Sequence, residues 1–359
     1  MAATEFALND ALAVQRWSTS LAVEAEKKQY FTKFMGTGED AMIKIQKELT
    51  KQAGESITVA MRMKLTGDGV EGDDPIEGTS AVKAMTFYND KVIINQRRTA
   101  AASKGAMSEQ RVPYDMRKEA RDAIATWWAE DYDEQTIMYL SGARGVDTSF
   151  HTPVGYTGRA GNSFNAPDTS HIVYAGAATA KTDLDSADVV DLTLIDRLVA
   201  KIETMDPQIM PFMIDGERRY VFLMHIYAAF DLRKSVSDGD WADIQKRQGA
   251  GSLLFKNALG EHNGIILHKH RNVIRYSDYG AGADVTACRN LLLGAQAGLI
   301  AWGGNGTGVG RYKWVEKLQD ADNRLEVYAG AIFGVKGAYF NSQWLGRIAV
   351  DSYCDDPNS

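Results

Sequence analysis

Six histidines are the first residues whose chemistry could carry a function, and in one place their spacing is suggestive. His268 and His270 lie two residues apart beside an apolar segment, so on a strand they would share one face and could chelate a metal ion. No cysteine or carboxylate pattern accompanies them, which favours ordinary buried histidines. His225 follows an apolar run and could act as a base, but no nucleophile motif lies near it. The other three stand alone: His151, His171 and His262.

A glycine-rich segment, Gly303–Gly310 (GGNGTGVG), could bring backbone N–H groups close to a phosphate. No reading frame completes Gly-x-Gly-x-x-Gly, because the sixth position counted from Gly306 is Arg311. No lysine follows a Gly-x-x-x-x-Gly pattern either. The segment therefore indicates a flexible surface turn, and a nucleotide site remains the alternative.

The segment Asp68–Glu77 is acidic and partly similar to a calcium-binding loop. The calcium pattern Asp-x-[Asp/Asn]-x-[Asp/Asn]-Gly fails at Val70 and at Gly72. We interpret the segment as a solvated acidic tip, with weak calcium binding at an assembled interface left open. Cys288 and Cys354 lack a Cys-x-x-Cys partner and are expected to be buried thiols. The sequence thus predicts no catalytic residue, no cofactor and no metal.

Composition restricts the class of protein further. The chain has 359 residues, is 45% hydrophobic, and carries 40 basic and 47 acidic residues, for a net charge of −7. This composition excludes wholesale disorder and argues against a dedicated nucleic-acid binder. Two cysteines cannot build a disulfide framework, which favours a reducing cytosol. The longest uncharged run, 291–310, has only about a dozen apolar residues and is too short to span a membrane, and no signal peptide is expected.

The elements that must position these residues begin with helices. Apolar residues at helical spacing predict helix over much of 1–35, and Gly36 and Gly38 end that pattern. A second, short helix is predicted over Asp40–Gln52, because Met42, Ile45 and Leu49 follow helical spacing. Gly54 would end it.

From Ile57 onward, hydrophobic residues recur at every second position instead of at helical spacing. Ile57, Val59, Met61, Met63 and Leu65 alternate with small or polar residues and predict a long strand. The acidic tip follows, and Thr86–Gln96 is the predicted return strand. The segment 55–112 therefore forms a long two-stranded projection, which is marginally stable alone and needs a neighbour to lie on. That neighbour could be another copy of the chain.

After Pro113 the strongest helical pattern runs to Ser141–Gly142, about 28 residues or about 42 Å. Such a length suits a structural strut. Residues 142–186 are rich in loop-forming types. The remaining pattern is mixed, so the class is α+β without regular βαβ units: helices at Leu192–Met205 and, buried, at Arg289–Trp302, and strands at Tyr220–Met224, Ile265–His268, Leu325–Val335 and Arg347–Tyr353.

Blocks in the order and spacing of a known family run along most of the chain. The sequence resembles the major capsid proteins of tailed bacteriophages, specifically the family typified by the capsid protein of coliphage N-four, which share the Hong Kong 97-type shell fold. After Ile76–Gly78 the segment Thr79–Ala84 is less acidic than the family pattern, so the resemblance implies nothing firm about the contacts of the return strand. The resembling blocks are Asn9–Val14 with Arg16–Ser18, Gly54–Val59, Leu65–Gly72, Arg97–Arg121 with Met107–Arg111, Trp241–Gln245, Leu259–Glu261, Leu291–Ala297 and Phe340–Ser342.

The resemblance implies a set of parts and partners. An N-terminal arm would occupy residues 1–54, an extended β-hairpin loop 55–112, a peripheral domain with the spine helix 113–189 and 311–359, and an axial domain 190–310. Copies would form hexamers and pentamers of an icosahedral shell in the virion, assembled in the host bacterial cytoplasm with scaffolding, portal and decoration proteins, beside packaged DNA and with no membrane. Expected subunit contacts are Trp17, Ile57, Val59, Met61, Met63, Leu65, Asp68, Gly69, Glu71, Asp73, Asp74 and Glu77.

Two other interpretations remain at this point. One is a nucleotide- or metal-dependent enzyme that uses Gly303–Gly310 with His268 and His270. The other is a phage accessory protein, either a decoration or a scaffolding subunit. The arm-plus-spine organisation and the length disfavour the accessory protein, since a scaffold would be more helical and more charged.

Overall fold

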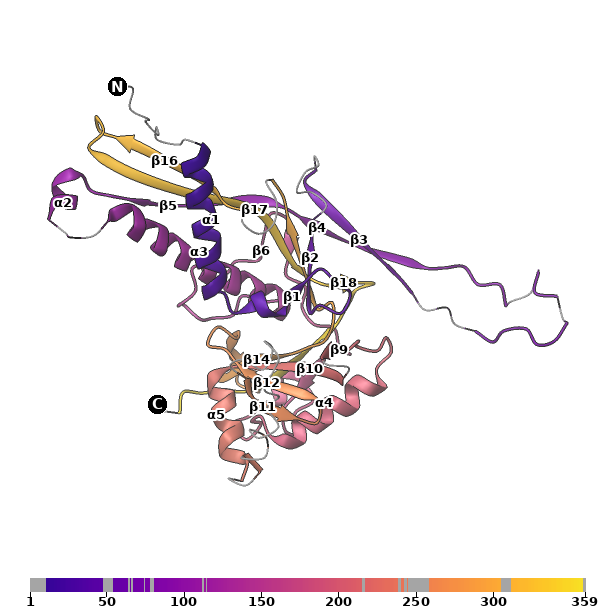
Figure 1. The fold of residues 1–359 in the computed structure, drawn as a ribbon. Coiled ribbons are helices and arrows are strands. Elements are labelled where there is room, and N and C mark those ends of the chain that lie inside the picture. The colour runs from indigo at the N-terminus through magenta and orange to yellow at the C-terminus, as the bar shows by residue number, and fades with distance from the viewer. Residues whose placement is uncertain are drawn as a thin grey trace.

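The computed structural model describes two bodies and a long projection (Figure 1). The spine body contains the helices of the N-terminal half and one sheet. The lower body contains a second sheet and the helices around it, and the projection leaves the spine body on the side away from α2. The described residues are 11–47, 54–63, 65, 67–73, 75–77, 81–111, 113, 115–214, 217–237, 240–241, 244, 258–304 and 311–357.

The long helix α3 is the centre of the spine body. Asp115 caps its first turn by accepting the N–H groups of Arg117 at 3.0 Å and Lys118 at 3.3 Å. Gly142, at φ 68°, ends it in the left-handed conformation that favours glycine. The helix predicted after Pro113 is thereby confirmed. The helical elements of this part are α1 (Ala11–Lys28), η1 (Phe31–Phe34), α2 (Ala106–Gln110) and α3 (Met116–Ser141).

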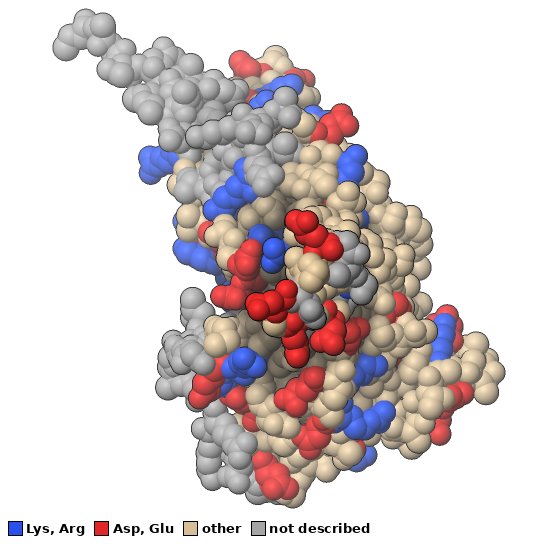
Figure 2. All heavy atoms as spheres, turned by 90° about the vertical axis from the view of Figure 1, so that its right-hand side faces the viewer, with Lys and Arg blue, Asp and Glu red and all other residues tan. Residues whose placement is uncertain are grey.

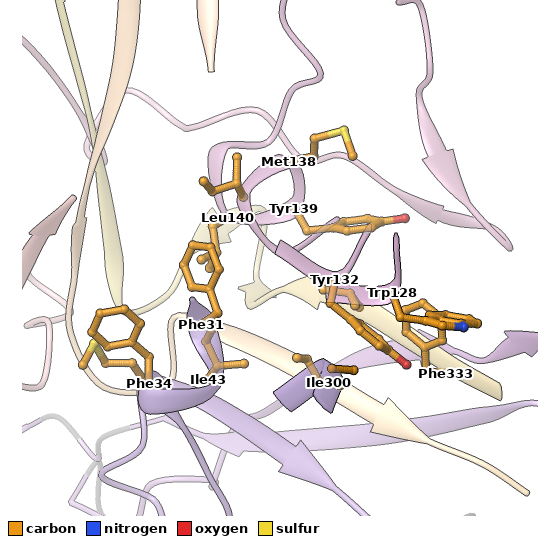
Figure 3. Close-up of a cluster of buried hydrophobic side chains, with 14 of the residues drawn as sticks. Phe31, Phe34, Ile43, Trp128, Tyr132, Met138, Tyr139, Leu140, Ile300 and Phe333 are labelled. Carbon is orange, nitrogen blue, oxygen red and sulfur yellow. The ribbon is translucent and has the colours of Figure 1, made fainter. Parts of the chain in front are cut away.

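A six-stranded sheet packs against α3, in the order β1-β2-β15-β17-β16, with β5 also pairing with β17. Figure 3 shows the aromatic part of the core between them, where Trp128 and Tyr132 of α3 meet Phe333 of β17. Tyr132 and Phe333 have ring centroids 4.6 Å apart. The strands are β1 (Met35–Gly36), β2 (Ile43–Gln46), β5 (Asn95–Ala102), β15 (Gly298–Trp302), β16 (Lys313–Gln319) and β17 (Arg324–Gly337).

The lower body is an eight-stranded sheet in the order β11-β12-β10-β14-β20-β8, with β13 paired to β14 and β9 to β10. One face packs on α4 (Leu192–Thr204) and α5 (Ile226–Ser235), and the other joins the core of the spine body. The strands are β8 (Ile172–Tyr174), β9 (Phe212–Ile214), β10 (Glu217–Met224), β11 (Ala258–His262), β12 (Ile265–Lys269), β13 (Arg275–Tyr279), β14 (Val285–Leu293) and β20 (Arg347–Tyr353).

Small elements complete the fold. The projection is the hairpin of β3 (Ser56–Arg62) and β4 (Phe87–Ile93), whose strands pair with each other alone. The loop-rich segment after α3 carries two-stranded and single-turn pieces rather than long elements. These pieces are β6 (Gly158–Arg159), β7 (Asn162–Ser163) and η3 (Lys181–Asp183). Farther along the chain, β18 (Tyr339–Phe340) and β19 (Gln343–Trp344) form another two-stranded sheet.

Two predicted helices are wrong. Within the segment 40–52, residues Ile43–Gln46 form β2, which lies parallel to β15. The predicted buried helix 289–302 is two strands, the end of β14 and the whole of β15, separated by a turn with Gln296 at φ 57°. Both segments are short apolar runs, for which periodicity does not separate a buried strand from a buried helix. Pairing with distant strands decides them.

The predicted return strand is also corrected. The stretch 86–96 is divided between β4, which pairs with β3, and β5, which pairs with β17. The chain passes from the projection into the spine sheet at Ile94, whose N–H still donates to the carbonyl of Glu55 at 2.9 Å. The projection is therefore shorter than the predicted arm of residues 55–112.

Candidate subunit-contact site

The β3–β4 hairpin is the feature that stands out from the two bodies. Seven residue pairs join its strands, from Ser56 opposite Ile93 to Arg62 opposite Phe87. One further hydrogen bond, from the Met63 N–H to the Thr86 carbonyl at 3.0 Å, continues the ladder outward. Beyond it the loop extends far to the right in Figure 1, away from both bodies.

The base of the hairpin is buried within its own chain. Ile57 and Val92 face each other and pack with Ile94, Leu299 and Ala301 in a small apolar cluster. Alternation places Val59 and Met61 on the same face farther out, where each is half-buried. The apolar face predicted for β3 is real, but its inner part contacts the spine sheet of the same copy.

Asn162 fixes the end of β4. The Ile93 N–H donates to Asn162 Oδ1 at 2.9 Å, and Asn162 Nδ2 donates to the Ile93 carbonyl at 2.7 Å. The Tyr139 hydroxyl of α3 donates to the Asn162 carbonyl at 2.9 Å and accepts the Arg159 N–H at 2.7 Å. The hairpin base is thereby tied to the spine helix.

A buried charge pair fixes the same base to β17. Asp90 is 6% exposed and accepts a hydrogen bond from Lys336 Nζ. Lys336 Nζ also donates to the Lys91 carbonyl at 3.2 Å, and Asp90 Oδ2 accepts the Tyr339 N–H at 3.3 Å. A charge removed from water needs such partners, so the pair favours one docking angle for the hairpin.

The outer half of the projection exposes apolar side chains. Leu65 is 58% exposed, and the return segment adds further apolar residues that are each more than half exposed. On a hairpin that projects away from both bodies, such residues mark a contact surface rather than a core. We call this set the outer apolar residues: Leu65, Ile76, Val82, Met85 and Phe87.

The tip is acidic and solvated. Asp68, Glu71, Asp73 and Glu77 are all exposed. Figure 2 looks at the molecule from the side on which the loop projects and shows acidic side chains gathered at its centre. We call residues 68–77 the acidic tip; Asp74 lies outside the described residues.

The predicted contact residues therefore fall into groups. Trp17 stacks on Trp314 of its own chain, with ring centroids 5.8 Å apart and planes 15° apart. Ile57 is buried internally, Met63 is half-buried, and Leu65 together with the described tip residues, Gly69 included, is exposed. Sequence reasoning missed the apolar residues of the return segment, Val82, Met85 and Phe87, although their apolar types beside a polar tip were a signal.

The residues considered for catalysis lie in packed surroundings. Lys33 Nζ lies 3.5 Å from His268 Nδ1, and the Tyr30 ring lies 4.6 Å from that of His270. Burial lowers the pKa of His270 to about 4. The described residues contain no group of three or more histidine, cysteine or acidic side chains placed to hold a metal ion. Residues 305–310 of the glycine-rich segment lie outside the described residues, so the structure does not address the nucleotide site considered there.

The two cysteines are buried, as predicted. Cys354 Sγ lies 3.3 Å from Nδ1 of His225, a pairing that could in principle activate a thiol. The hydrogen bond with Cys288 and burial hold the pKa of Cys354 well above its usual range. Burial also lowers the pKa of His225 to about 4, so the pair stays a neutral thiol beside a neutral imidazole.

Membrane insertion through a helix finds no support in the part of the chain that the structure covers. None of the helices described there combines the length and the apolar character that a membrane span requires.

Comparisons with known proteins agree with this geometry. The family model described as phage capsid protein matches residues 5–354. A major capsid protein of Pseudomonas phage KPP25 is 27% identical over 354 residues, covering 91% of this chain and 89% of that protein. The capsid of Ralstonia phage GP4 is 37% identical, covers 100% of both chains and superposes with a TM-score of 0.87.

A more distant structure shares the fold alone. The capsid protein of Cyanophage Pam1 is 19% identical, with a TM-score of 0.71 over 99% of this chain and 97% of that chain. The two bodies, the spine helix and the projecting hairpin are the architecture that the sequence resemblance implied. The chain belongs to the phage capsid protein family, has the Hong Kong 97-type fold of tailed-phage capsids, and is a major capsid protein, a structural component of the virion.

Proposed function

We propose that copies of this chain form hexamers and pentamers through head-to-tail contacts and close into an icosahedral shell around the phage genome. The observation that supports this is the β3–β4 hairpin, whose described residues pack against the spine body at its base and expose Leu65, Val82 and Phe87 beyond it. A heterologous contact of this kind generates rings when its rotation closes. In the assembly, the outer apolar residues lie on the next subunit and leave water there.

The parts of the shell subunit follow the chain as the sequence analysis divided it. We propose an arm at 1–54, an extended loop segment at 55–112 whose projecting part is the β3–β4 hairpin, a peripheral domain at 113–189 and 311–359, and an axial domain at 190–310. Each proposed domain contributes strands to the sheet of the other. β15 belongs to the proposed axial range but lies in the spine sheet, whereas β8 and β20 belong to the proposed peripheral ranges but lie in the lower sheet. This exchange supports a subunit whose two domains move as one piece.

The partners are those a shell requires. We propose scaffolding, portal and decoration proteins as partners. Packaged DNA lies nearby and is not bound specifically. The net charge of −7 supports weak contact between wall and DNA. The order of the sequence blocks favours the coliphage N-four type within the family. We propose a protein without catalytic activity, in which the buried His268, Cys288 and Cys354 are residues of the core.

The test is to express the chain with the scaffolding protein of its source and to image the product by electron microscopy. Closed shells with sixfold and fivefold capsomers are expected. A monodisperse monomer under every condition would overturn the proposal. Nucleotide and divalent-metal titrations by thermal shift serve as the control, because stabilisation by several degrees without assemblies would favour an enzyme instead.

A further inference from the structure

A basic groove lies on the side of the spine sheet that faces away from α1 and α3. Register places Lys313, Gly330 and Arg98 side by side across β16, β17 and β5. Gly330 makes room for the arginine, since a Cβ there would lie 2.8 Å from Arg98 Cγ. Gln96, Lys317 and Tyr328 complete a hollow of about 230 Å³.

The positive charge of this basic groove is not neutralised within the described part of the chain. Glu326, which lies opposite Lys317, is already engaged by Gln319 Nε2 at 2.7 Å, by Arg324 at 3.2 Å and by the Tyr328 hydroxyl. Among the described residues, Arg98, Lys313 and Lys317 have no carboxylate within 4.0 Å. Three cations therefore converge on a concave surface, where a shared anionic partner would interact with all of them.

The acidic tip has the complementary composition. Five acidic residues and no basic residue occur in 68–77. Its described carboxylates are exposed and make no ion pair with a described residue. The tip and the outer ends of β16 and β17 lie at opposite ends of the molecule in Figure 1, so the tip of one copy is directed away from its own groove. A contact between the two must therefore join different copies.

We propose that the acidic tip of one subunit docks into the basic groove of the next subunit. This proposal rests on the proposed shell function and deepens it, by naming the surface that receives the end of the loop. A hollow of about 230 Å³ accommodates one or two carboxylate side chains. A DNA duplex would instead need an extended basic stripe. Pairing of the two charged surfaces orients the head-to-tail contact and suppresses wrong registers.

Charge reversal tests the groove. In Lys313→Glu/Lys317→Glu, like charges would face each other, and the yield of closed shells is expected to fall by about tenfold. The matched control is Lys118→Glu/Lys269→Glu, which changes the net charge equally at two exposed lysines outside the groove. Adding Glu71→Lys/Asp73→Lys to the groove variant restores opposite charges and should recover shells. An unchanged yield in the groove variant, or no recovery in the charge swap, would overturn the docking.

Disulfide trapping tests the contact directly, since both native cysteines are buried. Asp73→Cys/Lys317→Cys shells, oxidised after assembly, should give covalent ladders on non-reducing gels. The single variants and Asp73→Cys/Lys269→Cys should not. Absence of ladders in intact shells would refute this contact while leaving the shell function standing, whereas failure of the wild-type chain to form any shell would refute the function itself. Normal shells with lowered DNA content in the groove variant would identify DNA as the partner of the groove and also overturn the proposal.

Discussion

Asn162 and Ile93 are joined through both ends of one side-chain amide. The Ile93 N–H donates to Asn162 Oδ1 at 2.9 Å, and Asn162 Nδ2 donates to the Ile93 carbonyl at 2.7 Å. The amide thus takes the place of a neighbouring strand at the end of β4. Because Asn162 is itself held by Tyr139 of the spine helix, the direction of the hairpin depends on this pair.

Replacing Asn162 with alanine should therefore weaken the base of the hairpin. The change leaves a backbone donor and an acceptor of Ile93 without partners, at a cost of about 1–3 kcal/mol. Chemical denaturation of the unassembled subunit measures it. Asn89→Ala, on the exposed side of β4, is the control and should change stability by less than about 0.5 kcal/mol. Equal stability of the two variants would show that the amide pair contributes nothing.

Asp133 of α3 connects the spine helix to the arm and should make stability depend on pH. Its carboxylate accepts the N–H of Tyr30 at 2.9 Å and that of Phe31 at 3.2 Å. Burial nevertheless raises the pKa of Asp133 from 3.8 to about 7. Between about pH 4 and pH 7, the Asp133 carboxyl is therefore protonated in the folded chain and ionised in the unfolded chain. The free energy of unfolding falls as the pH rises through this window.

In Asp133→Asn this dependence should disappear. The stability of the variant relative to wild type should grow between pH 5 and pH 7 by up to about 1.4 kcal/mol per pH unit. Denaturation of the unassembled subunit at several pH values measures the difference. Glu119→Gln, at an exposed position of the same helix, should show a flat difference. A flat difference for Asp133→Asn as well would contradict the raised pKa.

Gly142 at the end of the spine helix should not tolerate a side chain. It adopts φ 68°, and a Cβ there would lie 2.1 Å from the carbonyl oxygen of Asn165. Gly142→Ala should cost at least about 3 kcal/mol, since backbone strain and a backbone clash combine. Gly155 is the matched control, because its φ is 90° but no atom lies within 4 Å of a built Cβ. Thermal unfolding of the two variants should differ clearly, and similar losses would mean that Asn165 moves aside at little cost.

Deleting residues 67–78 should separate folding from assembly. The described tip residues are exposed except for the half-buried Val70, and none of them belongs to the buried clusters. The unassembled subunit should therefore unfold at the same denaturant concentration as wild type, while shell formation is impaired. Circular dichroism and electron microscopy measure the two properties. Loss of soluble subunit in the deletion would show that the tip supports the fold of its own copy.

Sequence patterns determined the elements whose signals are local. Twenty-six residues of α3, with Asp115 before them and Gly142 after them, carry a helical stripe, a cap and a stop. The alternation of β3 likewise indicated a strand with one apolar face, and the acidic residues beyond it indicated an exposed tip. These features depend on neighbours along the chain, so the sequence displays them directly.

Only the tertiary structure decided the segments whose partners are distant. Ile43–Gln46 and Gly298–Trp302 are strands because they pair with each other across more than 250 residues of sequence, and their apolar residues would also have suited a helix. The same holds for the hairpin, where the sequence predicted a projection in need of a neighbour. In the folded chain, Ile57 packs against Leu299 and Asn162 binds the backbone of Ile93. These contacts decide that the base of the hairpin is buried in its own copy, while the outer half stays available to the next subunit. Pairing energy between distant segments does not appear in any local pattern, because it exists only once the chain has folded.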